Sequence, residues 1–137
     1  QEAADPLAHL VPVTGVDHLA GMIDVARRLY AAPAIKQYVV DLVAATRVDP
    51  LLRLGASPRA AIQLLRAAKA VAAMAGRSHV LPDDVQGLVV PVLAHRLLAS
   101  PDARLSGRTI EETLTAVVKA TALPPVSRTA PDRRATG

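Results

Sequence analysis

The residue whose type and position most clearly suggest chemistry is Arg59, in the sequence GASPRA at residues 55–60. Ser57 is the predicted N-cap of a helix and Pro58 its first residue. Arg59 then falls in the first turn, at the positive end of the helix dipole, where an anion is favoured and a cation is not. We therefore expect a compensating anion. A phosphate would suit both the guanidinium fork and the free N–H groups of a helix start.

The alternative is a structural ion pair between Arg59 and an acid elsewhere in the fold. Asp49 and Asp84 are the candidate carboxylates, and structural ion pairs are commoner than functional ones. The sequence leaves both interpretations open.

No catalytic or metal-binding constellation accompanies this arginine. The chain has no cysteine, and its four histidines, His9, His18, His79 and His95, lack a spacing such as H-x-x-x-H. The acidic pair Asp83-Asp84 follows Pro82 at a predicted helix start, where carboxylates serve the dipole. The phosphate-binding pattern G-x-x-x-x-G-K-[ST] is absent, so the chain cannot form a P-loop by itself. We predict no catalytic residue and no metal ligand.

The composition predicts a helical domain with an aliphatic core. Apolar residues make up 51% of the 137 residues, yet there is no Phe or Trp, and the many alanines favour helix. No apolar run reaches the ~20 residues of a membrane span. The absence of cysteine is compatible with a reducing cytosol, so we expect a cytoplasmic location. The net charge of +4 permits nucleic-acid binding, but the cations form no dense run and aromatic residues for stacking are few.

Apolar periodicity predicts five helices, over about 16–29, 34–47, 58–75, from 82 onward, and 110–121. Pro91 predicts a kink or an early stop in the fourth. No strand alternation appears, and 101–107 is expected to be loop. The fold class is therefore all-α, a compact bundle of about five helices. Residues 1–13 are expected to be an extended linker, 14–122 the helical domain, and 123–137 a disordered tail.

Local signals mark two of the helix starts. Thr14 and Asp17 resemble a capping box at the first helix, and Thr109 and Glu112 form a standard one at the last. Leu81 is a poor cap for the fourth helix. The third helix has a narrow polar side of Arg59, Gln63 and Arg66, so it is expected to lie centrally in the bundle.

Five motifs occur in an order that resembles the C-terminal lid subdomain of MoxR-family AAA+ ATPases. They are YVVDLVAATR at 38–47, GASPRA at 55–60, AGR at 75–77, VLPDDV at 80–85 and VLAHR at 92–96. The resemblance covers about residues 14–122. It departs from the family at Leu81, where Thr or Ser is more usual.

The resemblance implies that Arg59 is the sensor 2 arginine, supported by Ser57 and Pro58 at the helix N-terminus. It would reach the phosphates of ATP, bound with Mg²⁺ by a preceding AAA+ core that this chain lacks. We therefore expect a fragment that binds no cofactor and hydrolyses no ATP alone. The expected partners are that missing core, neighbouring subunits of a ring, often a hexamer, and a von Willebrand factor A-domain protein. The implied role is chaperone-like maturation or activation of partner proteins.

Two other functions remain open at this point. The chain could be a basic helical module that binds nucleic acid, since positive charge and an arginine at a helix start serve that as well. It could also be a protein-interaction bundle whose arginine is structural. The scarcity of basic clusters and aromatic residues argues against the nucleic-acid reading, so nucleic acid is not an expected partner.

Overall fold

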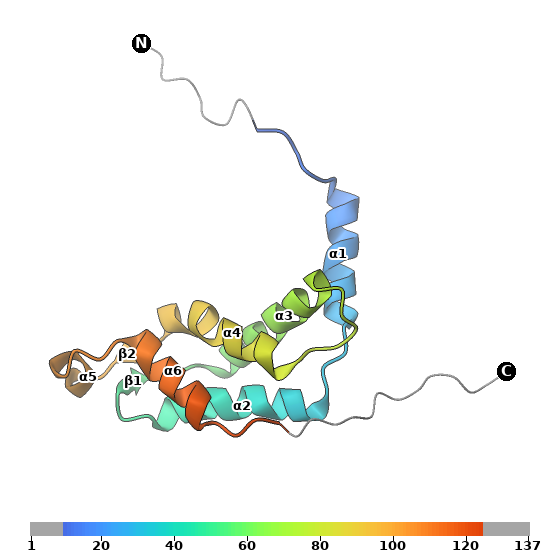
Figure 1. Ribbon diagram of the computed structural model, residues 1–137. Helices are drawn as coiled ribbons and strands as arrows, with labels where there is room; N and C mark the ends of the chain where they lie inside the picture. The colour runs from blue at the N-terminus through green and yellow to red at the C-terminus, as the bar shows by residue number, and fades with distance from the viewer. Residues whose placement is uncertain (1–9, 125–137) are drawn as a thin grey trace, which may run out of the picture.

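The computed structural model describes residues 10–124, and these are almost entirely helical (Figure 1). The elements are α1 (Val16–Arg28), α2 (Pro33–Val48), β1 (Leu52–Leu54), α3 (Pro58–Met74), α4 (Pro82–Leu93), a 3₁₀ turn η1 (Ala94–Arg96), β2 (Leu98–Ala99), α5 (Pro101–Leu105) and α6 (Ile110–Ala120). The all-α fold class is confirmed. Residues 1–9 of the expected linker and 125–137 of the expected tail lie outside the described residues.

Helix α3 is central, because it packs against α1, α2 and α4. Its buried side chains recur every fourth residue, at Ala60, Leu64, Ala68 and Ala72. Three of these four are alanine, so the neighbouring helices can approach the α3 backbone closely. The predicted central position of this helix is confirmed.

Helices α2, α4 and α6 complete the core around α3. Tyr38 of α2 is buried, and its hydroxyl accepts a hydrogen bond of 3.1 Å from Gln86 Nε2 of α4. Helix α6 packs on α2 and α4 through the buried residues Leu114 and Val117. This aliphatic core fixes both the direction of α3 and the position of its first turn.

Helix α1 lies at the edge of the bundle, against α3. It contains no buried residue and contacts α3 on one side, while it stands clear of α2 and α6 in Figure 1. Its apolar stripe is largely uncovered: Val16 is 84% and Ile23 44% exposed. Periodicity in the sequence shows that a helix is amphipathic, but it does not show what covers the apolar face.

Two small elements were not expected. Strands β1 and β2 form a two-stranded antiparallel sheet in which Leu52 pairs with Ala99, and α5 occupies part of the stretch predicted as loop. Both elements are short. A strand of two or three residues carries no readable alternation, and Ser100 caps only five helical residues.

The helix starts agree with expectation in part. Thr109 and Glu112 form the predicted capping box of α6. At α1 the predicted box is wrong, because Gly15 is the N-cap and the Thr14 hydroxyl lies 3.1 Å from His18 Nδ1 instead. Pro91 does not stop α4, which continues two residues to Leu93 before the chain enters η1.

Candidate functional site

Arg59 lies exposed in the first turn of α3. Within residues 10–124 its side chain makes no hydrogen bond and no ion pair; the two ion pairs found there join Arg27 to Asp24 and Arg77 to Asp84. The guanidinium is therefore open to a group from outside the described chain.

The structural ion pair considered for Arg59 is wrong for both candidate acids. Asp49 Oδ1 accepts a hydrogen bond of 2.8 Å from the N–H of Leu51, in the turn between α2 and β1. The carboxylate of Asp84 is engaged by Arg77 at the opposite end of α3. Neither carboxylate neutralises the charge of Arg59, so its guanidinium is available to an anion from outside the described residues.

In the first turn of α3, the Arg59 guanidinium is a better candidate to bind an anion than the backbone N–H groups. Ser57 is the N-cap as predicted, and its hydroxyl accepts from the N–H of Ala60 at 3.3 Å. The N–H of Ala61 bonds to the Ser57 carbonyl at 3.4 Å, and Pro58 has no N–H at all. Few free helix-start amides remain for a phosphate. The binding capacity therefore rests on Arg59 more than the sequence argument assumed.

The start of α3 is held by the end of α2. Thr46 is fully buried, and its hydroxyl accepts a hydrogen bond of 2.9 Å from the N–H of Ala56. Arg47 Nε donates a bond of 2.7 Å to the carbonyl of the same residue. No role in the site was predicted from the sequence for either Thr46 or Arg47. Both lie in the recognised ATR triplet at 45–47, which was the only signal available.

Arg59 belongs to a positively charged face of α3. Ile62, Gln63 and Arg66 follow at the i+3, i+4 and i+7 positions, and α3 contains no acidic residue. Beside this face a groove of about 570 Å³ separates α3 from α1. Its apolar walls are Ile23, Ala26, Ile62 and Leu65, and its cations are Arg27, Arg66 and Lys69.

Two backbone contacts join the end of α1 to the rest of the fold beside this groove. Lys69 Nζ donates to the carbonyl of Arg27 at 3.0 Å, which ties the end of α1 to α3. Tyr30, just after α1, pairs with His79 in an isolated parallel bridge. The surface formed by α1 and α3 therefore combines apolar side chains, positive charge and an unpaired arginine.

Within residues 10–124, Arg77 and Asp84 are the two titratable groups whose pKa clearly departs from its ordinary value. Hydrogen bonds from Arg77 lower the pKa of Asp84, with a further contribution from the N–H of Leu81, against the opposing effect of burial. The same hydrogen bonds raise the pKa of Arg77. The pair joins the end of α3 to the start of α4, away from Arg59, so its role is structural.

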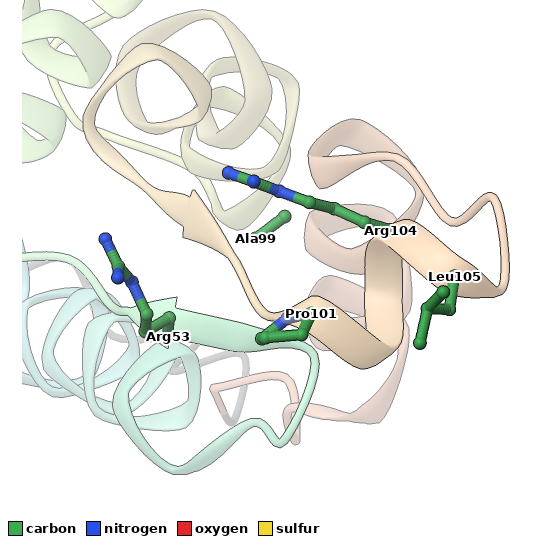
Figure 2. Close-up of a pocket in the computed structure, with 5 residues that line it drawn as sticks. All are labelled: Arg53, Ala99, Pro101, Arg104 and Leu105. Atoms are coloured by element: carbon green, nitrogen blue, oxygen red, sulfur yellow. The ribbon is translucent and has the colours of Figure 1, made fainter.

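A second hollow, of about 400 Å³, lies at β2 and α5 (Figure 2). Arg53 and Arg104 flank it, and Ala99 and Pro101 lie between them. It contains no carboxylate, thiol or imidazole among its lining residues, so it offers no catalytic group.

The remaining predicted features add no chemistry. Asp83 is exposed, and His95 Nε2 accepts a hydrogen bond from Arg96 Nε at 3.0 Å on the surface. No group of three or more potential metal ligands occurs among residues 10–124. In that same range no helix has the length and hydropathy needed to span a bilayer.

Comparison with known proteins finds a family to which the chain is similar. Residues 44–117 match the sequence model of the AAA lid domain family. That range includes α3, Arg59 and both residues that hold Ala56.

The chain is similar to several curated proteins and solved structures. The protein YeaC of Bacillus subtilis, which is uncharacterised, is 35% identical over 90% of the chain; protein MoxR of Paracoccus denitrificans is 38% identical over 67%. Chaperone MoxR1 of Mycobacterium tuberculosis is 33% identical over 89%. A crystal structure named "putative ATPase", from Cytophaga hutchinsonii, superposes with a TM-score of 0.68 and 26% identity, covering 74% of this chain and 33% of that one.

The chain is much shorter than these relatives. It spans 39% of YeaC, 30% of the Paracoccus protein and 34% of MoxR1. The shared part is therefore a minor portion of each.

Proposed function

The chain belongs to the AAA lid domain family, as a lid of the MoxR-type AAA+ ATPases, and from that premise we propose that it closes over a nucleotide-binding core and that Arg59 senses the bound nucleotide. The observation that carries the proposal is the state of Arg59. It is exposed at a helix start and unpaired within residues 10–124, and both acids that could have neutralised it are engaged elsewhere.

The residues present fit a phosphate. Arg59 offers a planar fork of donors that matches phosphate oxygens, and the cations Arg66 and Lys69 on the same helix keep the local potential positive. In the intact protein ATP and Mg²⁺ would supply the anhydride and the charge that the metal neutralises. This chain would supply one movable positive group and no catalytic base.

The α1–α3 surface supports docking on a second domain. Isolated lids would leave Ile23 and Ile62 in water, and a groove of about 570 Å³ is large enough to receive side chains from an ATPase core. With the core docked there, Arg59 would approach the nucleotide when the lid closes and release it after hydrolysis. The rigid bundle would then pass the motion on.

The wider role is proposed from the named relatives. MoxR1 is named a chaperone, which supports a chaperone-like role in the maturation or activation of partner proteins. Assembly into a ring, often a hexamer, and a von Willebrand factor A-domain partner belong to the same proposal and rest on the family resemblance.

The test is ATP turnover by the intact ATPase carrying Arg59→Ala. Removing a group that stabilises phosphate charge in the transition state is expected to reduce kcat by about 10²-fold. The matched control is Arg104→Ala, which removes another exposed arginine from the hollow at α5. Unfolding temperatures of both variants should remain near that of the parent. Near-normal turnover by Arg59→Ala would contradict the sensor role.

A further inference from the structure

The start of α3 is anchored through a single residue, Ala56. Its N–H donates to the Thr46 hydroxyl at 2.9 Å, and its carbonyl accepts from Arg47 Nε at 2.7 Å. Consecutive residues of the last turn of α2 therefore hold both backbone polar groups of one residue, three positions before Arg59. We name this arrangement the Ala56 clasp.

The Thr46 hydroxyl is fully used inside the clasp. It also donates to the carbonyl of Val43 at 2.7 Å, so its single proton is committed to α2 and its lone pair to Ala56. Thr46 is fully buried and Ala56 is 1% exposed, so water cannot substitute for either group. If the hydroxyl were lost, the N–H of Ala56 would have no partner.

The backbone next to the clasp has no room to shift. A Cβ added at Gly55 would lie 2.5 Å from the carbonyl oxygen of Thr46 and 2.7 Å from the backbone of Arg47. The chain before α3 therefore touches the α2 backbone directly. Close packing on one side and two hydrogen bonds on the next residue together fix the direction in which α3 begins.

We infer that Thr46 is a positioning residue for Arg59: through Ala56 it sets where the exposed guanidinium stands relative to the nucleotide. This inference rests on the proposed function of Arg59. Because a small displacement of a charge-stabilising group costs much of its effect, the hydroxyl of Thr46 should influence turnover without touching the nucleotide.

The test is a double-mutant cycle in the intact ATPase, using Thr46→Val, Arg59→Ala and the double variant. Valine has nearly the shape and volume of threonine and carries a methyl group in place of the hydroxyl. Thr46→Val is expected to lower kcat about tenfold when Arg59 is present. In the Arg59→Ala background it should change kcat by less than about twofold, because nothing remains to be positioned. Thr46→Ser, which restores the hydroxyl, should recover most of the activity.

The matched control is Thr113→Val. Thr113 is 1% exposed in α6, and its hydroxyl donates to the carbonyl of Thr109 at 2.9 Å, so the same chemical change is made in the core without touching the clasp. It is expected to leave kcat within about twofold of the parent, because no contact joins Thr113 to Arg59 and the Thr109 carbonyl keeps its backbone hydrogen bond from the N–H of residue 113. An equal loss of kcat in both valine variants would overturn the inference, since general destabilisation would then explain it.

A second variant keeps the test valid if Thr46→Val does not fold. Arg47→Ala removes an exposed side chain and only the bond to the Ala56 carbonyl. Its loss of kcat, expected at two- to threefold, should also vanish in the Arg59→Ala background. If the losses of kcat in the cycle are additive, the positioning role of the Ala56 clasp is contradicted while the sensor role of Arg59 is retained. Normal turnover by Arg59→Ala alone would contradict both roles.

Discussion

Arg77 and Asp84 join the end of α3 to the start of α4 through two hydrogen bonds of 2.6 and 2.5 Å. The same carboxylate accepts from the N–H of Leu81 at 2.8 Å, which is the half of a capping box that does not need a polar N-cap side chain. The side chain of Asp84, the third residue of α4, therefore binds the backbone just before its own helix. It also binds Arg77, which lies in the loop between α3 and α4.

Replacing Asp84 by alanine should destabilise the fold by about 1–3 kcal/mol, because the side chain is buried and three donors lose their acceptor. The measurement is urea unfolding followed by circular dichroism. Asp83→Ala is the matched control, because it removes an exposed acid from the preceding position in the same turn. Equal changes in the two variants would mean that the Arg77 pair contributes no stability.

The pH dependence of stability should carry the signature of the same carboxylate. Hydrogen bonding from Arg77 holds the pKa of Asp84 below its ordinary value in the folded state. Its stabilising contribution is therefore present above the unfolded pKa of about 3.9 and is lost as pH falls below it, through the lower folded pKa. Thermal unfolding between about pH 7 and pH 2 should show this loss in the parent and a flatter profile in Asp84→Asn. Parallel profiles for the two proteins would contradict the assignment.

Gly55→Ala should destabilise the protein by about 1–3 kcal/mol, because the new Cβ would meet backbone atoms that cannot rotate away. Gly87→Ala is the informative control. Gly87 lies inside α4 with nothing within 4 Å of the added methyl group, so the same substitution should stabilise the helix by about 0.4–1 kcal/mol. Chemical unfolding of both variants measures the change in the free energy of unfolding, which should be negative for Gly55→Ala and positive for Gly87→Ala. A stabilised Gly55→Ala would show that the contact between α2 and the start of α3 is looser than described.

Helix caps that depend only on residues close together along the chain could be predicted from the sequence. The N-cap Ser57 and the box formed by Thr109 and Glu112 require only residues three apart, and both are present. The same reasoning failed at Thr14, because a box also needs the geometry of the incoming chain. Local periodicity also does not show what covers an apolar stripe, and the stripe of α1 contains no buried residue.

Arg59 could be proposed as a site residue from the sequence, but the residues that hold the chain before it could not. Arg59 was singled out because its charge opposes the local dipole, an effect confined to one turn. The partners of Thr46 and Arg47 lie 10 and 9 residues away across a loop and strand β1, and no periodicity connects them. Arg77 and Asp84 are likewise joined across a turn, so a structure was needed to show that Asp84 is not the partner of Arg59.

The face shared by α1 and α3 should be needed for activity and not for folding, and Ile62 tests this. Ile62 is 53% exposed beside the groove, one turn after Arg59, and serine has a helix propensity close to that of isoleucine. Ile62→Ser should therefore change the free energy of unfolding by less than about 1 kcal/mol. In the intact ATPase it should lower turnover several-fold, because an apolar contact to the docked core is lost. Leu105→Ser alters a side chain that is 87% exposed at the separate hollow near α5, and turnover should remain at the parent level. Equal turnover in the two serine variants would place the core on another surface of the bundle.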